Sequence, residues 1–229
     1  MEQLHKRMEA LPAYRNLRDA VRNGRFPRLV TGLSAIHKAF FISALCADTG
    51  MTAHILVPNE PFGARLCEDI NTFLAEECAL LYPVRELSFR PVESASHEYE
   101  YTRLGVLYQM LSGKCRIVIS TPEAAAQFTL PPPVYLQNTR LLTAGESGDL
   151  TELCAHLVQA GYTRTDQVEG ISQFAVRGGI LDFFPPGAPA PYRVEFWGDE
   201  IDTISLFDAA TQRRREGVKS AEISPAREA

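Results

Sequence analysis

The sequence lacks the features that would assign the protein to a membrane, secreted or metal-binding class. No apolar run approaches the roughly 20 residues that a bilayer-spanning helix needs, and the charged, mixed residues 1–6 do not resemble a secretory signal. The 5 cysteines contain no C-x-x-C pair, and the 5 histidines contain no H-x-x-x-H pair. An odd number of cysteines without such spacing favours buried thiols in a reducing compartment. We therefore expect a cytoplasmic protein with no membrane span, no disulfide framework and no metal ion.

Positive charge is also scarce, because 23 lysines and arginines face 28 aspartates and glutamates and leave a net charge of -5. A chain that holds nucleic acid by charge alone normally shows a basic excess. We interpret the one short basic run, residues 213–215, as a solvated edge strand rather than a phosphate-binding patch. With 229 residues, of which 45% are hydrophobic, the chain suits one large domain or two smaller ones.

The first half of the chain alternates apolar runs with amphipathic segments. The continuous apolar runs predict buried strands, and apolar side chains three or four residues apart predict helices. The predicted strands are 28–31, 54–57, 78–82 and 116–120, and the predicted helices are 4–21 with a break at Pro12, 39–47, one capped by Asn59, and one opened by Ser96. This order predicts an α/β domain with a parallel sheet that helices cover on both faces.

Three consecutive prolines, residues 131–133, mark the predicted boundary between a first domain, 1–133, and a second domain, 134–229. Asp149 followed by Glu152 resembles a capping box that opens a helix. Glycine-containing turns at 178–179 and 198–200 separate β-rich runs and predict two hairpins, formed by 174–177 with 180–184 and by 192–197 with 201–207. The second domain is therefore predicted to be a smaller α+β domain with an antiparallel sheet.

Residues 29–39 stand where a phosphate-binding loop would stand, between a predicted strand and a predicted helix. A working loop reads G-x-x-x-x-G-K-[ST]; here Gly32 and Lys38 match, but His37 replaces the second glycine and Ala39 replaces the hydroxyl residue. A side chain at position 37 crowds the approach of the backbone to phosphate, and a methyl group cannot bind Mg²⁺. We interpret the segment as a degenerate, non-functional nucleotide loop, although an ordinary turn glycine at position 32 would explain it too.

A set of motifs in the second half resembles a known family. The motifs are FAVRGGILDFFP at 174–185, YRVEFWGDEI at 192–201 and LFD at 206–208. They resemble the second domain of the excision-repair protein UvrB and the matching domain of the bacterial transcription-repair coupling factors, the Mfd family. Because UvrB keeps an intact phosphate-binding loop and the coupling factors carry a decayed one, the chain is more similar to the N-terminal UvrB-like module of a coupling factor, truncated before the module is complete. The first domain would then be a degenerate RecA-like domain, similar to UvrB domain 1a.

The resemblance implies a function that this chain would perform without catalysis. It would be a protein-recruitment module that binds the nucleotide excision repair protein UvrA and couples DNA repair to stalled RNA polymerase. The parent protein would be an ATP-driven DNA translocase whose motor is absent here. ATP, Mg²⁺, DNA and RNA polymerase would then be bound by the missing parts, so we expect no cofactor in this chain and no enzymatic activity.

The resemblance also suggests which residues bind UvrA. The family pattern Tyr-x-Arg-x-Asp matches Tyr162 to Asp166, and the pattern Phe-Arg-x-Arg-Gly matches the stretch from Phe174 with Arg177 in the second arginine position. Arg164, Asp166, Phe174 and Arg177 are therefore the candidate UvrA-binding residues. Position 175 is alanine where the pattern has arginine, which weakens the expected contact or moves it to other residues.

Other interpretations stay open at this stage. Arg164 and Arg177 could be solvated hairpin residues, or could pair with Asp166 and Asp182 on their own surface. The chain could instead be a UvrB-like helicase fragment that binds ATP and DNA, an alternative supported only by Gly32 and Lys38. It could also be a DNA-binding module. We interpret the pair 199–200 as a hairpin turn rather than a magnesium site, and position 197 as a packed or edge aromatic rather than a base-stacking platform.

Overall fold

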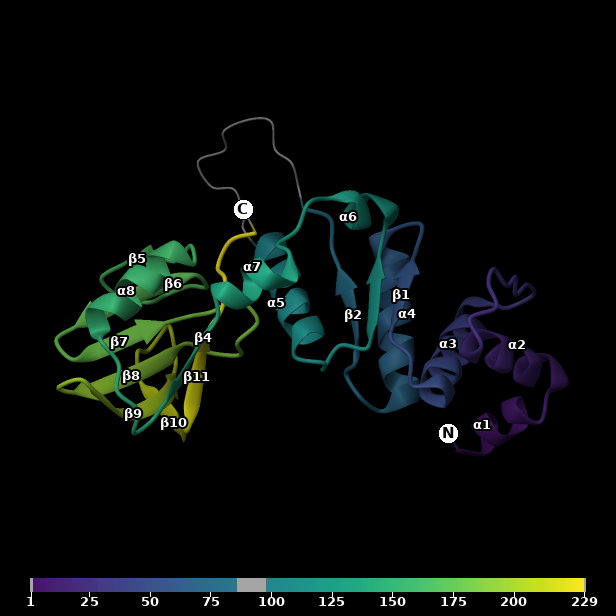
Figure 1. The fold of residues 1–229 in the computed structure, drawn as a ribbon, viewed down its shortest axis with the longest axis horizontal. Coiled ribbons are helices and arrows are strands. Elements are labelled where there is room, and N and C mark those ends of the chain that lie inside the picture. The colour runs from purple at the N-terminus through teal and green to yellow at the C-terminus, as the bar shows by residue number, and fades with distance from the viewer. Residues whose placement is uncertain (1, 86–97, 229) are drawn as a thin grey trace. The chain divides into compact units, whose positions relative to one another are not determined.

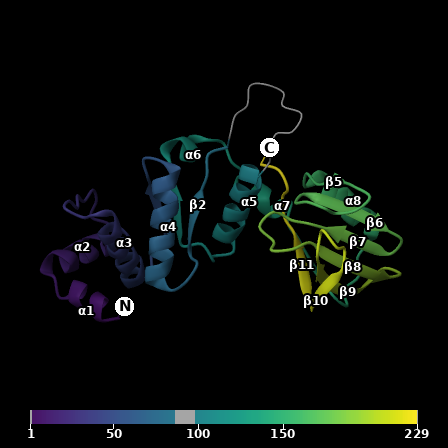
Figure 2. The same cartoon turned by 180° about the vertical axis from the view of Figure 1, so that it is seen from behind.

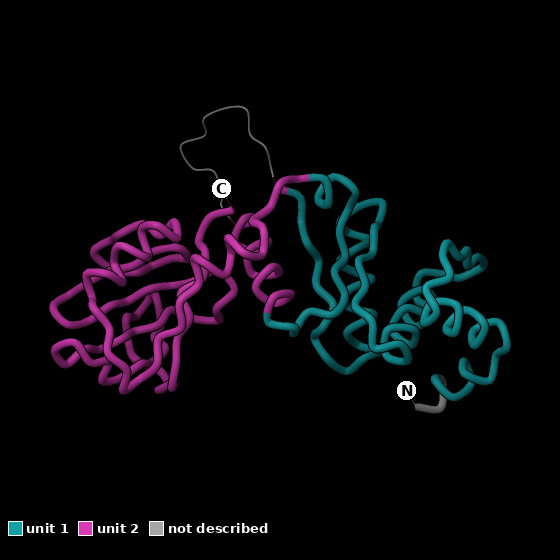
Figure 3. Tube along the Cα trace, in the orientation of Figure 1, with its two compact units in different colours: residues 1–84, 112–126 teal, residues 85–111, 127–229 magenta. Residues whose placement is uncertain are grey.

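The structure is a computed structural model that describes residues 2–85 and 98–228. The chain folds into two compact units, which Figure 3 colours separately: unit 1 contains residues 1–84 and 112–126, and unit 2 contains residues 85–111 and 127–229. Within the described ranges the fold is mixed α/β, with one parallel sheet in unit 1. Unit 2 has the predicted antiparallel pairing except at one edge, where residues 163–164 pair parallel with residues 173–174. Ser96, which was predicted to open a helix, lies outside the described residues.

Along the chain of unit 1, helices precede the first strand, separate the first two strands and follow the last one. Its elements are α1 (Glu2–Glu9), α2 (Pro12–Arg22), α3 (Ala35–Thr49), β1 (Ala53–Leu56), α4 (Glu60–Leu74), β2 (Ala79–Tyr82), β3 (Ile117–Ser120) and α6 (Pro122–Ala126). Figure 1 shows these elements in one view and Figure 2 from behind. The helix boundaries follow local signals: Pro12 stands in the first turn of α2, and the Asn59 side chain caps α4 by accepting a hydrogen bond from the Phe62 amide at 2.9 Å.

The sheet of unit 1 has three parallel strands in the order β1-β3-β2. The middle strand, β3, is buried along its whole length, as expected for a strand covered on both faces. Helix α4 packs closely on the sheet at Gly63, where an added Cβ would lie only 2.9 Å from the Leu81 side chain. The parallel strands predicted at 54–57, 78–82 and 116–120 are therefore confirmed. That this unit is RecA-like stays a prediction.

The strand predicted at 28–31 is wrong. Residues 25–34 have neither helix nor strand, and Leu29 is 87% exposed. Two adjacent apolar residues form a strand only when a neighbouring strand pairs with their main chain. In the described part of unit 1, β1 and β2 pair only with β3 and do not pair with this segment.

The described part of unit 2 contains three helices and two sheets. Its elements are α5 (Glu98–Leu111), α7 (Pro132–Gln137), β4 (Arg140–Thr143), α8 (Leu150–Gln159), β5 (Thr163–Arg164), β6 (Gln173–Arg177), β7 (Ile180–Phe183), β8 (Tyr192–Trp197), β9 (Glu200–Phe207), β10 (Arg214–Val218) and β11 (Ser220–Ile223). The larger sheet has the order β10-β9-β8-β7-β6-β5, and β11 pairs with β4 in the smaller one. The Asp149 side chain caps α8, as predicted, by accepting bonds from the Thr151 and Glu152 amides.

Both predicted hairpins are present in the larger sheet. β6 pairs antiparallel with β7 across the turn at 178–179, and β8 pairs antiparallel with β9 across the turn at 198–199. Phe174, Leu181 and Val194 lie in one buried cluster together with Leu153 and Leu157 of α8. The inner face of the sheet therefore carries the core of unit 2. The basic run at 213–215 enters the edge strand β10, which confirms its prediction as an edge strand.

Helix α5 belongs to unit 2 by its packing, although the predicted linear boundary at 133 assigned it to the first domain. Arg103 of α5 and Glu228 are both fully buried, and the guanidinium donates to the two carboxylate oxygens from Nε at 2.7 Å and from Nη2 at 2.9 Å. The Glu228 amide also donates to the Glu100 carboxylate at 2.8 Å. These bonds hold the helix against a segment more than a hundred residues later in the chain.

The five cysteines are free thiols. Burial raises the pKa of the Cys67 thiol to about 11, and burial also raises the pKa of Cys46 and Cys115. These thiols are therefore protonated at neutral pH and poorly nucleophilic. In the described part of the chain no helix combines the length and the apolar content needed to cross a membrane.

Replacing Arg103 with methionine should strongly destabilise unit 2, because it leaves the Glu228 carboxylate buried without its counter-charge. The expected loss is about 3–5 kcal/mol of the free energy of unfolding, measured by urea denaturation together with amide hydrogen exchange of unit 2. Arg214→Met is the matched control, since Arg214 lies 3.8 Å from Glu195 with both side chains partly exposed. It should cost less than about 1 kcal/mol, and equal losses for both variants would contradict the assignment.

Candidate protein interface

The candidate interface lies on the face of the larger sheet that points away from the core, which we call the outer face. Side chains alternate between the two faces along a strand, so the neighbours of the core residues point outward. The register places Ala175 of β6, Asp182 of β7 and Arg193 of β8 side by side in one row across three strands. Arg177 follows two residues after Ala175 and therefore lies on the same face.

Asp182 is the centre of an ion cluster on the outer face. Its carboxylate is only 1% exposed and accepts three hydrogen bonds from two arginines. Arg193 donates from Nε to Oδ1 at 2.7 Å and from Nη2 to Oδ2 at 2.8 Å, and Arg177 donates from Nη2 to Oδ2 at 2.6 Å. We call Asp182, Arg177 and Arg193 the Asp182 cluster. Such bidentate, charge-assisted pairing is the geometry in which an arginine–carboxylate bond is strongest.

The two arginines of this cluster have different surroundings. Arg193 is mostly buried and stacks over the Phe207 ring at 4.6 Å from the centroid. The hydrogen bonds to Asp182 raise the pKa of Arg193, so its charge is permanent. Arg177 keeps 41% of its side chain exposed. The Asp182 carboxylate faces two guanidinium groups, and the charge of Glu195, which also raises the pKa of Arg193, balances part of the remaining positive charge.

Arg164 and Asp166 lie elsewhere on the sheet. Both side chains are exposed, and in the described part of the chain no ion-pair partner contacts Arg164. The register pairs Arg164 with Phe174, whose ring points into the core, so Arg164 points to the α8 side of the edge strand β5. The charge of Arg164 acts on the Cys154 thiol of α8, where it opposes the rise in pKa that burial causes. The structure therefore does not bring Arg164 and Arg177 together on one face.

Phe174 and Ala175 do not present side chains to a partner, because each is only 1% exposed. Phe174 belongs to the core, so its contribution to binding would consist of positioning β6. Ala175 packs with Val168 and Phe207 in a small buried cluster on the outer face, so this part of that face is covered. An arginine at position 175 would need this small cluster to rearrange, which is a physical reason for the departure from the family pattern.

The structure adds Arg193 to the residues singled out from the sequence. The alternating pattern of β8 placed residue 193 on the polar face of a strand, but nothing local indicated that it shares a carboxylate with Arg177. Asp182 was considered only as a partner that could neutralise Arg177. Its position between apolar neighbours in β7 was the available signal, since an aspartate buried in a strand requires a paired cation.

The degenerate nucleotide loop does not form a compact cradle. Gly32 adopts φ 81°, but no atom would meet a Cβ within 4 Å there, so nothing approaches its backbone closely. The Ser34 hydroxyl and the His37 ring are hydrogen-bonded at 3.0 Å. Lys38 is exposed, and Ala39, which replaces the hydroxyl residue, is fully buried in the core of unit 1. A side chain buried in the core at position 39 does not face an external ligand.

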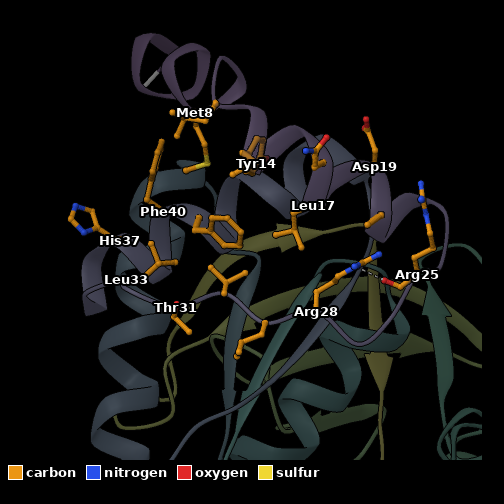
Figure 4. Close-up of a pocket in the computed structure, with 17 residues that line it drawn as sticks. Met8, Tyr14, Leu17, Asp19, Arg25, Arg28, Thr31, Leu33, His37 and Phe40 are labelled. Carbon is orange, nitrogen blue, oxygen red and sulfur yellow. Dashed lines mark hydrogen bonds between the residues drawn. The ribbon is translucent and has the colours of Figure 1, made fainter.

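A hollow of about 880 Å³ lies beside this loop, between α1, α2, residues 25–33 and the start of α3 (Figure 4). Most of its lining is apolar, and in Figure 4 Leu33 lies near His37 at one end of the hollow. In Figure 4 Arg25 and Arg28 lie at one end and His37 at the other. The cationic side chains therefore do not converge on one point, as a phosphate group would require.

One group of side chains in unit 1 has the composition of a metal site. His5, Glu9 and Asp48 could each offer one ligand atom, and these atoms lie within 4.8 Å of one another. The Asp48 oxygens are already used, since His5 Nε2 lies 2.7 Å from Oδ1 and the Tyr14 hydroxyl donates to Oδ2 at 2.6 Å. Burial and this bond raise the pKa of Tyr14. The group is explained as a hydrogen-bond network that joins α1 and α2 to α3.

The sequence matches a known domain family and several known proteins. The UvrB interaction domain family matches residues 141–228. The chain is 32% identical over 216 residues to the transcription-repair-coupling factor of Bacillus subtilis (strain 168), with 94% of this chain and 18% of that protein covered. It is 29% identical over 203 residues to that of Staphylococcus aureus (strain USA300), with 89% and 17% covered, and 31% identical over 191 residues to that of Haemophilus influenzae (strain Rd), with 83% and 16% covered. The chain thus spans less than a fifth of the length of these relatives.

Titration of the chain with Mg-ATP should give no binding heat, because the loop between Gly32 and Lys38 provides neither a closed ring of amides nor a hydroxyl ligand for Mg²⁺. Isothermal titration calorimetry at millimolar nucleotide is the measurement. A dissociation constant in the micromolar range, lost in a Lys38→Ala variant, would contradict this interpretation of the loop.

Proposed function

The chain belongs to the transcription-repair-coupling factor family, and on that premise we propose that it is a non-catalytic module that recruits the excision-repair protein UvrA. In a complete member of the family, this contact would bring nucleotide excision repair to stalled RNA polymerase. The observation that carries the proposal is the Asp182 cluster, which presents Arg177 on the sheet that the UvrB interaction domain family covers.

The geometry around Arg177 suits a docking contact. The Asp182 carboxylate holds one guanidinium nitrogen at 2.6 Å, so the side chain is oriented before a partner arrives. Its other nitrogens remain available for bidentate bonds to a carboxylate of the partner. Because a preoriented side chain loses less conformational entropy on binding, more of the contact energy contributes to affinity.

Arg164 supplies a second, separate contact in this proposal. It stands on the edge strand β5 and is exposed, which leaves its guanidinium free to reach a partner that extends around the edge of the sheet. Asp166 lies two residues further along the chain and is exposed as well. A partner would therefore contact the edge at β5 and the outer face at Arg177 as two parts of one interface.

A catalytic role has less support. An exposed Lys38 without converging donors, and an alanine buried at position 39, lack the electrostatic elements on which phosphoryl transfer depends. We therefore propose that this chain binds no nucleotide and catalyses no reaction, and that any ATP-dependent step of the whole protein takes place outside it.

Arg177→Ala and Arg164→Ala should each weaken binding to purified UvrA, measured by biolayer interferometry or calorimetry. We expect a loss of about 1–3 kcal/mol for each, since hydrogen bonds to charged groups have this size. Asp182 keeps its bidentate bond to Arg193 in the Arg177 variant, so the fold should persist. Because the two sites lie apart, the losses in the double variant should be roughly additive.

Arg15→Ala serves as the matched control, because Arg15 is an exposed arginine on α2 of unit 1. It should leave the affinity unchanged. If the double variant Arg164→Ala, Arg177→Ala binds UvrA as tightly as the unmodified chain, the assignment of the site is wrong.

A further inference from the structure

Trp197 is the single tryptophan of the chain and is 84% exposed at the end of β8. An indole ring offers a large apolar surface, so a nearly complete exposure leaves that surface in contact with water. The ring is not part of the buried core cluster of unit 2. The hairpin turn after it is formed by the backbone of Gly198, which adopts a positive φ. The family motifs that suggested Arg164 and Arg177 did not assign a role to Trp197.

The position of Trp197 brings it close to Arg177. Val194 and Phe196 point toward the core, so Glu195 and Trp197 point to the outer face. The turns of the two hairpins lie at the same end of the sheet, because the Phe196 amide donates to the Gly179 carbonyl at 2.8 Å. From the strand spacing, the main chains at Arg177 and Trp197 are about 12 Å apart. Two long side chains at this separation fall within one contact patch.

The charges between these residues are largely paired. Glu195 stands in the row of Arg177 and Ile180 and lies 3.8 Å from Arg214 of the edge strand. Arg215 pairs with Asp208 further along the same edge. Asp182 and, in part, Glu195 balance the two guanidinium charges of the Asp182 cluster. The partly exposed Arg177 presents the remaining positive charge on the same face as the Trp197 indole.

We propose that Arg177 and Trp197 form a two-residue docking surface for a partner protein whose own surface carries a carboxylate beside an apolar recess. The carboxylate would complement the free edge of the Arg177 guanidinium, and the recess would receive the indole. Tryptophan and arginine are the residue types most enriched among residues that dominate binding energy. This inference rests on the proposed function, in which the partner is UvrA, and it adds Trp197 as a contact residue.

A nucleic acid is a weaker fit for this surface, although an exposed indole can stack on a base. Asp199 is exposed in the turn after Trp197, and Glu200, the first residue of β9 and the register partner of Trp197, is exposed as well. Two carboxylates at this position would repel the phosphate groups on either side of a stacked base. A protein surface avoids this repulsion, because it can place neutral or basic groups opposite them.

The test compares Trp197→Ala with the matched control Phe128→Ala, since Phe128 is an aromatic residue of unit 2 that is 95% exposed in another part of the chain. We expect the first variant to weaken UvrA binding about tenfold or more and the control to leave it unchanged. Trp197→Phe should retain part of the affinity because it keeps an aromatic ring. In the combined variant Arg177→Ala, Trp197→Ala the two losses should be coupled rather than additive.

A second readout follows the indole directly. The chain labelled with 5-fluorotryptophan should show one ¹⁹F resonance, since it contains a single tryptophan, and that resonance should shift or broaden when UvrA is added. Binding that depends on Arg177 but not on Trp197, with an unchanged resonance, would overturn this inference and leave the proposed function intact. A shift caused by a single-stranded oligonucleotide and not by UvrA would assign Trp197 to base stacking and overturn it too. Absence of UvrA binding by the unmodified chain would overturn both proposals.

Discussion

The buried carboxylate of Asp182 is the constraint on which the outer face of the larger sheet depends. A charge with 1% exposure is costly unless it is paired, and three hydrogen bonds from Arg177 and Arg193 supply that pairing. The same bonds join β6, β7 and β8 through their side chains in addition to their main chains. Arg193 is mostly buried and Arg177 is partly exposed. Arg177 is therefore the charged group of the cluster that reaches the surface, and its hydrogen bond to Asp182 fixes its orientation. A stabilising interaction of the fold thereby also orients Arg177 at the surface.

The features predicted correctly from the sequence are those with local signals. The hairpins follow from glycines at the turns, such as Gly198 with φ 61°, and helix α8 follows from the Asp149 cap. What could not be predicted depends on residues far apart in the chain. Leu29 and its neighbour have the apolar character of a strand, but pairing with another strand decides the outcome. Helix α5 is held by the ion pair between Arg103 and Glu228, which are 125 positions apart. No sequence pattern around Arg103 predicts this pairing.

In the candidate site, too, the sequence predicted which residues are involved but not the contacts between distant residues. Arg164 and Arg177 were predicted from a family pattern that keeps their spacing, whereas their placement on opposite faces follows from the register of β5 against β6. The sharing of Asp182 by two arginines follows from the register of three strands and could not be derived from spacing alone. In unit 1 the degenerate nucleotide loop stays a prediction: the backbone at Gly32 is open and Ala39 is buried, and an ordinary turn glycine would show the same.

The central claim is that the chain acts by presenting the outer face of this sheet to UvrA. A structure of the two proteins in complex tests it most directly. The account predicts the Arg177 guanidinium at hydrogen-bond distance from a carboxylate of UvrA, with its Asp182 bond retained and the Trp197 indole buried in the interface. A complex in which the outer face of the sheet remains in solvent, and UvrA contacts unit 1 or α8 instead, would contradict it.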